Sequence, residues 1–202
     1  MTKPMQTFRL VLASSSPRRR QLLAEAGYDL VVVSPSIQEP AGALENLAPS
    51  QQAESLAYFK ARAVAAERPD DVVLAADTVV AVGDRVLGKP ADRAEAEGML
   101  RALSGTRHRV ITGMALLWPD DRRLIASATT YVTMRKMSEQ EIQQYLGSGE
   151  WIGKAGAYAI QETADRFVES VEGSFTNVVG LPMELLERMI QQHDNAPGAR
   201  KA

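Results

Sequence analysis

The sequence contains no cysteine, so it offers no disulfide, no thiolate nucleophile and no ligand set for a zinc ribbon. Its two histidines, His108 and His193, are too few for a histidine-rich metal site. No apolar run approaches the roughly 20 residues that span a bilayer. No hydrophobic signal core follows the first residues. We therefore expect a cytoplasmic protein that does not act at a membrane.

An excess of one charge is also lacking, because 23 Lys and Arg face 25 Asp and Glu for a formal net charge of −2. Proteins that coat nucleic acid are normally clearly basic, so we expect no nucleic-acid polymer as a partner. The other fractions, 45% hydrophobic and 24% charged, are those of an ordinary globular protein. A chain of 202 residues fits one α/β domain, or one domain with a modest second lobe.

Short apolar runs alternate with amphipathic segments, which predicts an α/β fold with a mixed, partly antiparallel sheet. We expect strands over residues 8–13, 30–33, 72–76, 109–118 and 122–134. We expect helices over residues 17–26, 50–68, 91–103, 138–147 and 182–192. The third strand is expected to end at Asp77, and Gly83-Asp84 predicts a hairpin turn.

Two familiar phosphate-binding motifs are nearly present, and both fail. Residues 83–89 have Walker A spacing, but Pro90 stands where a Ser or Thr hydroxyl is needed for Mg²⁺. Residues 147–149 resemble the start of a dinucleotide-binding motif, but Ile152 occupies the position of its third glycine. The sequence therefore argues against both a P-loop and a Rossmann site.

A serine-rich turn, residues 14–17, connects the first strand to the first helix. A helix start presents free N–H groups and the positive end of the helix dipole, and serine hydroxyls add donors. Arg18 and Arg19 in the first turn oppose that dipole unless an anion lies there. An anion site and a solvated basic turn explain these residues equally well.

Four further charged residues are candidates for a site. Asp77 lies where an apolar strand gives out, and ligands gather at the carboxyl ends of strands in α/β sheets. There it could ligate Mg²⁺ or orient a water, or simply cap a turn. Glu39, in the loop of residues 34–49, could add a second oxygen ligand or remain a solvated loop charge. Lys60 interrupts an apolar helical stripe, where it either snorkels or enters a cleft, and Lys89 is held between Gly88 and Pro90.

Six motifs in order resemble the Maf family over about residues 8–190. They are Ala13-Ser14-Ser15-Ser16-Pro17-Arg18-Arg19, Ala76-Asp77-Thr78-Val79-Val80, Gly88-Lys89-Pro90, Ser104-Gly105-Thr106, Lys154-Ala155-Gly156-Ala157-Tyr158-Ala159-Ile160-Gln161 and Asn177-Val178-Val179-Gly180-Leu181-Pro182. The resemblance implies a nucleoside triphosphate pyrophosphatase with a house-cleaning role and an inosine-triphosphatase-like fold. That fold is an elongated mixed sheet with flanking helices and two lobes around a central cleft. It would occupy residues 1–194 as a single domain and leave 195–202 as a flexible tail.

The resemblance also implies roles for individual residues. Asp77 would accept the proton from water and, with Glu39, hold a divalent Mg²⁺ or Mn²⁺. The residues expected to bind the substrate phosphates are Ser14, Arg18, Arg19, Lys60 and Lys89, and the positions expected to set base specificity are Arg18, Thr78 and Gln161. The substrate is the expected partner, and a homodimer is left open.

Two of the six motifs, residues 154–161 and 177–182, resemble the dTTP/UTP branch of the family. The Gln161 amide offers a donor and an acceptor, as the O4–N3 edge of uracil and thymine requires. The chain departs from that branch at Ala159, at Phe175 and over residues 162–166. The alternatives are a preference for 7-methyl-GTP and a non-catalytic, nucleotide-binding regulator of septum formation. A serine hydrolase using Ser14 or Ser16 with His108 is a further alternative, although no Gly-x-Ser-x-Gly elbow supports it.

Overall fold

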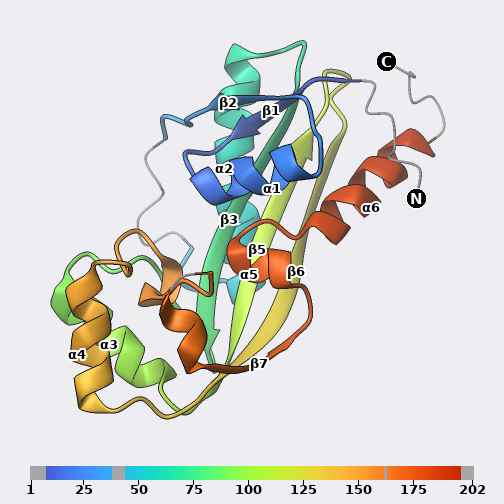
Figure 1. Cartoon of the computed structure of the whole chain (residues 1–202). Helices are drawn as coiled ribbons and strands as arrows, with labels where there is room; N and C mark the ends of the chain where they lie inside the picture. The colour runs from blue at the N-terminus through green and yellow to red at the C-terminus, as the bar shows by residue number, and fades with distance from the viewer. Residues whose placement is uncertain (1–7, 38–43, 162, 197–202) are drawn as a thin grey trace.

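A computed structural model describes residues 8–37, 44–161 and 163–196, which form an elongated α/β molecule (Figure 1). Its strands are β1 (Leu10–Ala13), β2 (Leu30–Val33), β3 (Val72–Val82), β4 (Arg85–Leu87), β5 (Arg107–Leu117), β6 (Arg123–Met134) and β7 (Val168–Glu172). Its helices are α1 (Pro17–Glu25), α2 (Pro49–Glu67), α3 (Arg93–Leu103), α4 (Glu139–Ser148), α5 (Phe175–Val179) and α6 (Met183–Asp194), with 3₁₀ turns η1 (Ala155–Ala157) and η2 (Thr163–Phe167).

The seven strands form one mixed sheet in the order β2-β1-β3-β5-β6-β7, with β4 paired to β3. β1 lies parallel to β2 and β3, whereas the pairs β3–β5, β5–β6 and β6–β7 are antiparallel. The predicted mixed α/β fold is confirmed, and so is the hairpin at Gly83-Asp84, since Val82 pairs with Arg85 across that turn.

One edge of β3 is incompletely paired, and this gap determines where the site forms. β5 pairs with β3 along residues 73–81 on one side. On the other side β1 pairs only with residues 72–74, and β4 only with residues 80–82. Residues 75–79 therefore have no strand partner on this edge within the described chain. The prediction that the strand ends at Asp77 is wrong, because pairing with β5 carries the strand on through Asp77 to Val82.

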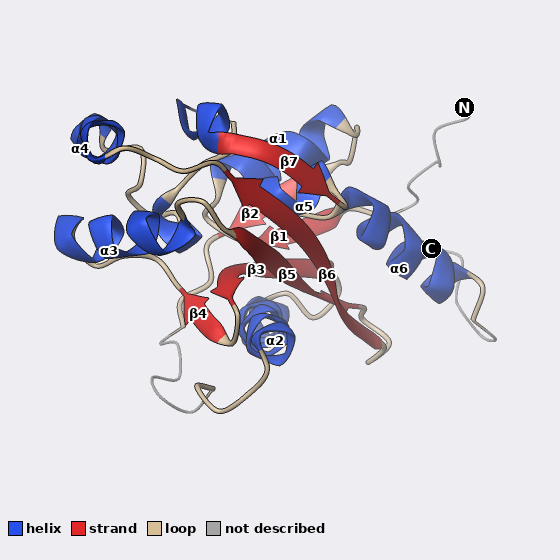
Figure 2. Ribbon diagram, turned by 90° about the horizontal axis from the view of Figure 1, so that it is seen from below, coloured by secondary structure: helices blue, strands red, loops and turns tan. Residues whose placement is uncertain are grey.

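Helices cover both faces of the sheet, with α2 on one face and α1 and α5 on the other (Figure 2). The alternation along β3 explains this arrangement, since successive side chains point to opposite faces. Val73 and Ala75 pack in a core with Ala57 and Ala61 of α2. Leu74 and Ala76 pack in a separate core with residues of α1 and α6, including Leu23 and Leu186.

A further core forms the second lobe, around α3 and α4 at the lower left of Figure 1. β3, β5 and β6 run through both lobes. Val80, Val110 and Val132 of these strands belong to the core of the second lobe. Leu74, Met114 and Ala126 of the same strands pack in the core that contains residues of α1 and α6. The expected elongated mixed sheet with flanking helices is thus confirmed, and this one sheet joins the two lobes.

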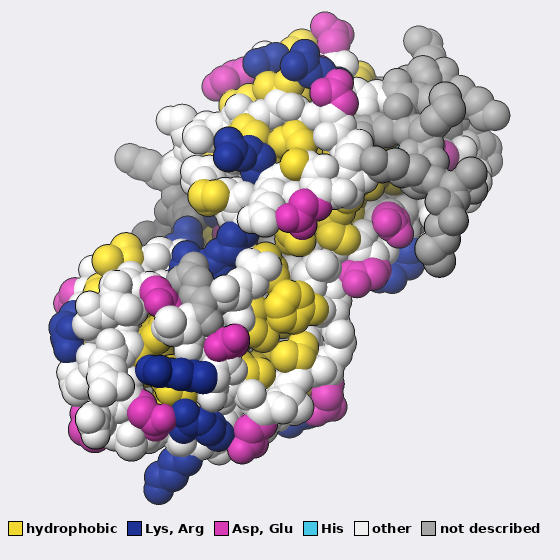
Figure 3. Space-filling view, viewed as in Figure 1, with side chains coloured by type: hydrophobic (Ala, Val, Ile, Leu, Met, Phe, Trp, Pro, Cys, Tyr) yellow, Lys and Arg dark blue, Asp and Glu magenta, His cyan; other side chains and the backbone are white. Residues whose placement is uncertain are grey.

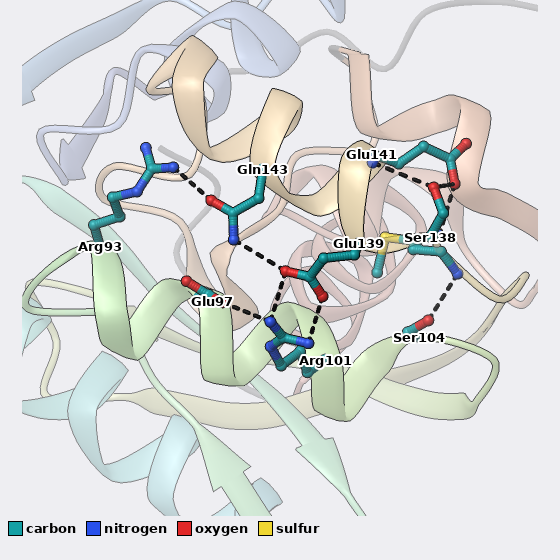
Figure 4. Close-up of polar contacts among 9 residues, drawn as sticks. Arg93, Glu97, Arg101, Ser104, Ser138, Glu139, Glu141 and Gln143 are labelled. Carbon is teal, nitrogen blue, oxygen red and sulfur yellow. Dashed lines mark hydrogen bonds and ion pairs between the residues drawn. The ribbon is translucent and has the colours of Figure 1, made fainter.

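Polar contacts tie α3 to α4 on the surface of the second lobe (Figure 4). Arg101 of α3 binds Glu97 of its own helix and Glu139 of α4, with N–O distances of 2.7 Å and 2.6 Å. Arg93 donates to Gln143 at 2.7 Å, and Gln143 donates to Glu139 at 3.1 Å. Exposed pairs of this kind contribute little each, about 0–1 kcal/mol, so the buried core supplies most of the stability of the lobe.

Helix α2 lies unusually close to β5, because Gly113 has no side chain. A Cβ at Gly113 would lie 2.3 Å from the backbone of Ala53 and Glu54, inside any normal contact distance. Gly113 pairs directly with Asp77 of β3. The close approach therefore fixes the height of α2 above the sheet about two helical turns before Lys60, whose side chain reaches Asp77.

Several element boundaries differ from those expected. α4 ends at Ser148 and is capped by Gly149 rather than Gly147, because Gly149 adopts the left-handed conformation (φ 75°) that closes a helix. The short elements β7, α5, η1 and η2 were not expected. Within the described residues no helix is long and apolar enough to cross a membrane. Of the expected tail, only Asn195 and Ala196 lie among the described residues.

We predict that Gly113→Val lowers the free energy of unfolding by about 3 kcal/mol or more, because the new side chain displaces α2. The matched control is Gly98→Ala in α3, where a Cβ meets nothing within 4 Å and the φ is ordinary. Chemical denaturation of the two variants and the parent protein measures the free energy of unfolding of each. That change should stabilise the protein by about 0.5–1 kcal/mol through helix propensity. A Gly113→Val variant as stable as the parent would contradict the close approach.

Candidate active site

A cleft of about 440 Å³ opens between the two lobes at the gap in the edge of β3. Lys and Arg side chains line the indentation between the upper and lower parts of the molecule (Figure 3). The charged residues among its described lining are five cations and one carboxylate: Arg18, Arg19, Lys60, Lys89, Lys154 and Asp77. This excess of positive charge is local, since the whole chain is slightly acidic.

Asp77 lies in the middle of the unpaired stretch of β3 and forms an ion pair with Lys60. Lys60 Nζ donates to Asp77 Oδ1, and both side chains are only 12% exposed. The lysine within the apolar stripe of α2 therefore enters the cleft instead of snorkelling to the surface. A largely buried pair of this kind is costly to break, since either partner alone would leave a poorly solvated charge.

Arg19 binds the protein itself rather than reaching into open space. Its Nη1 donates to the Ala76 carbonyl at 2.7 Å and to Ser14 Oγ at 3.3 Å. Its Nη2 donates to Thr78 Oγ1 at 3.1 Å, and its Nε donates to the Gly180 carbonyl at 2.8 Å. Burial lowers the pKa of Arg19, and the nearby charge of Asp77 opposes this effect. Arg19 thus joins α1, β3 and the segment after α5 at the unpaired edge.

The serine-rich turn forms the wall of the cleft at the start of α1, with Ser14, Ser15, Ser16 and Arg18 all in its lining. Ser14 is 5% exposed, and its Oγ accepts hydrogen bonds from the Ser16 N–H at 3.2 Å and from Arg19. Both lone pairs of this hydroxyl are therefore used, and its proton remains to donate to a further acceptor. That geometry suits the oxygen of an anion.

The opposite wall comes from the second lobe. Lys89 and Lys154 supply charge, and Tyr158 and Ile160 supply apolar surface. Ile152 also lines the cleft, although it is 65% exposed. The sequence alone predicted no role for Ile152, Lys154 or Tyr158. Lys154 and Tyr158 do belong to one of the Maf motifs, residues 154–161, but only the fold brings them opposite the serine-rich turn.

Most of the expected site residues meet in this cleft: Ser14, Arg18, Arg19, Lys60, Asp77, Thr78 and Lys89. Gln161 does not line it and has an exposed side chain. Glu39 lies outside the described residues. The serine hydrolase alternative is not supported, because His108 is 1% exposed and its Nε2 contacts the Tyr158 hydroxyl at 2.8 Å rather than a serine.

The donor set of the cleft fits a divalent ion that is held largely by phosphate. Among the described residues no three carboxylates or histidines lie together as a metal cage. Asp77 is the one carboxylate there that lines the cleft. Mg²⁺ is commonly held by one or two carboxylates together with substrate phosphates, which is the arrangement Asp77 allows.

Comparison with known proteins identifies the family. The model of Maf-like proteins matches residues 9–193. The chain belongs to the Maf family. It is 46% identical over 185 residues to a dTTP/UTP pyrophosphatase of Pelotomaculum thermopropionicum, covering 91% of this chain and 95% of that protein. A dTTP/UTP pyrophosphatase of Symbiobacterium thermophilum is 47% identical over 183 residues, with 91% and 93% covered. One from Cereibacter sphaeroides is 49% identical over 175 residues, with 86% and 89% covered.

The fold is shared with a solved structure of a HAM1 protein from Coxiella burnetii. The two chains superpose with a TM-score of 0.50 at 16% identity, covering 92% of this chain and 99% of the other. At this identity the likeness shows a common fold for the two chains, and the Maf membership comes from the sequence matches.

We predict different roles for the two neighbouring arginines. Arg19→Ala leaves buried acceptors on β3 and after α5 without a donor, so we expect it to lower the free energy of unfolding by about 2–4 kcal/mol. Arg18→Ala is the matched control and should cost clearly less stability. Chemical denaturation measures both changes. Equal stability losses would contradict the role of Arg19 at the edge of β3.

We also predict that His108 makes the protein less stable in mild acid. Burial lowers its pKa from 6.5 to about 4. Between these values the unfolded chain binds a proton that the folded protein does not, so stability falls as the pH drops. From pH 7 to pH 5 this effect amounts to about 2 kcal/mol. His108→Gln should remove that loss, as measured by denaturation at both pH values. An unchanged loss in the variant would show that other groups cause it.

Proposed function

We propose that this protein hydrolyses dTTP and UTP to the monophosphate and pyrophosphate. The observation that carries the proposal is Asp77, the one carboxylate among the described residues of the cleft lining, surrounded by cations at the unpaired edge of β3. The family relatives named above are dTTP/UTP pyrophosphatases, and they are alike in length to this chain. No observation favours a non-catalytic regulator or a preference for 7-methyl-GTP.

The cations suit a triphosphate better than a long nucleic acid, because they face inward from both lobes instead of forming a basic outer surface. Arg18 and the Ser14 hydroxyl approach from the start of α1, where the helix dipole also favours an anion. Lys89 and Lys154 approach from the second lobe. The substrate would therefore lie across the cleft with its phosphates between the lobes.

The reaction needs a water, a proton acceptor and stabilisation of the leaving group. The water oxygen attacks the α-phosphorus, and its proton passes to the Asp77 carboxylate. The bond between the α-phosphorus and the bridging oxygen breaks, and pyrophosphate leaves with the electron pair. The nearby lysines and Arg18 offset the negative charge that develops on pyrophosphate. Lys60 donates to Asp77 Oδ1 and so holds the carboxylate in place for this role.

A divalent cation, Mg²⁺ or Mn²⁺, is part of the proposal. When bound, it would neutralise phosphate charge in the cleft. Of the described residues, Asp77 would hold it together with the phosphates, and Glu39 is the second ligand that the sequence suggests. We further propose that residues 1–194 act as one catalytic domain.

We predict that Asp77→Asn lowers kcat by at least about 100-fold on dTTP and UTP while the fold is kept. The amide retains an oxygen for Lys60 but is a far weaker proton acceptor. Release of monophosphate and pyrophosphate is measured with saturating Mg²⁺ or Mn²⁺ over a panel of canonical and modified nucleoside triphosphates. Asp70→Asn, an exposed change just before β3, is the matched control and should behave as the parent protein.

Near-normal pyrophosphate release by Asp77→Asn would remove Asp77 from the reaction. Tight nucleotide binding by the parent protein without any monophosphate formed would overturn the proposed activity. A preference for 7-methyl-GTP or ITP in the panel would overturn the proposed substrates while leaving the reaction in place.

A further inference from the structure

A chain of buried polar groups runs from the cleft into the molecule. Thr78 Oγ1 lies 2.9 Å from Thr112 Oγ1 of β5, and Thr112 Oγ1 lies 3.2 Å from the Asn177 carbonyl of α5. Thr112 and Asn177 are completely buried, and Thr112 is not part of the cleft lining. Thr112 therefore acts on a bound molecule only through Thr78, which does line the cleft.

Asn177 is firmly held, so its carbonyl is a fixed reference point for this chain of groups. Its Nδ2 donates to the Val110 carbonyl at 3.0 Å and to Thr130 Oγ1 at 2.9 Å. Thr130 Oγ1 in turn contacts the backbone of Ser174, at the start of α5. These bonds tie α5 to β5 and β6.

One arrangement of protons makes all of these contacts attractive. The Asn177 carbonyl only accepts, so the Thr112 hydroxyl donates to it. Thr112 then accepts from Thr78, whose proton points away from the cleft. Thr78 also accepts from Arg19 Nη2, which only donates. The reverse direction would set the oxygens of Thr112 and Asn177 against each other without a proton between them.

The Thr78 hydroxyl is therefore left with one lone pair, so toward a molecule in the cleft that Thr78 lines it can only accept a hydrogen bond. Ser14, on the neighbouring wall, has the opposite character, since both of its lone pairs are used and its proton is left to donate. Ser14 suits a phosphate oxygen. Thr78 does not, because the oxygens of an ionised phosphate have no proton to give.

The surface around Thr78 suits a nucleobase. Val80 lies two residues further along β3 on the same face, and Val110 pairs with Val80 on β5. Val178 and Val179 of α5 complete an apolar part of the cleft lining. A flat base packed there would bring its polar edge to the single acceptor that Thr78 presents.

We propose that Thr112 is a positioning residue that fixes Thr78 as the acceptor for the N3–H group of uracil or thymine. This inference rests on the proposed function and deepens it. Cytosine has an unprotonated N3, which would face the lone pair of Thr78 without a hydrogen between them. A sugar hydroxyl donates or accepts as required, so its recognition would not need a hydroxyl of fixed direction.

The test compares Thr112→Val with Thr112→Ser, using UTP and CTP as substrates in the presence of Mg²⁺. Valine has the shape of threonine without its hydroxyl, so the Thr78 proton is released to turn into the cleft. We expect the ratio of kcat/KM for UTP to that for CTP to fall by about tenfold in Thr112→Val, the effect of one mispaired polar contact. The change should appear in KM, because the base contact does not alter during the reaction. Thr112→Ser keeps the hydroxyl and should retain the parent ratio.

An unchanged UTP to CTP ratio in Thr112→Val, or an equal loss of kcat on both substrates with KM unaltered, would overturn the inference. If Thr112→Val does not fold, Thr78→Val and Thr78→Ser replace the pair. The ratio should then fall in the valine variant alone, and an unchanged ratio there would be decisive against Thr78 as the acceptor. Failure of the proposed function looks different, since the parent protein would then hydrolyse neither UTP nor dTTP.

Discussion

The site depends on β3, which is paired on one edge but has five residues without a strand partner among the described residues on the other. Unpaired strand edges carry free N–H and C=O groups, which proteins normally cover. Here Arg19 takes the place of a neighbouring strand at Ala76, and the cleft occupies the space that such a strand would fill. The seven candidate residues that meet in the cleft are arranged around this interruption, because β1 ends just before it and the hairpin of β3 and β4 closes it from the other side.

The pleat of β3 separates two tasks within a dipeptide. Asp77 faces α2 and its lysine, whereas Thr78 faces α1, α5 and the buried hydroxyls. Adjacent residues of a strand point to opposite faces, so the Asp77 carboxylate and the Thr78 hydroxyl are each positioned by contacts on a different face of the sheet. The absence of a side chain at Gly113 serves the first face by admitting α2, and Thr112, the next residue back along β5, serves the second.

The sequence was a good guide to the strands, the long helices and seven of the residues that meet in the cleft, because apolar periodicity and ordered motifs are local signals. The predicted end of the strand at Asp77 was wrong. A polar residue after an apolar run occurs both at the end of a strand and within a strand that lacks a partner on one edge, so the sequence pattern does not distinguish the two. It gave no hint of Thr112, because a lone threonine in a strand has no periodic signal and its partner lies 65 residues away. Gln161, a motif position expected to contact the base, has an exposed side chain outside the cleft lining, and its role stays a prediction.

The continuity of three strands through both lobes has a mechanical consequence. Lobes joined by a flexible linker can swing together around a ligand, but these two share β3, β5 and β6 as a common spine. A hinge at the cleft would have to bend a hydrogen-bonded sheet, which rigid packing resists. Entry and release of a small molecule would then depend on movement of segments at the rim of the cleft, such as the glycine-bearing segment that contains Ile152. Loops of this size move in nanoseconds to microseconds. The spine would thus keep the distance between the two walls constant through the turnover cycle.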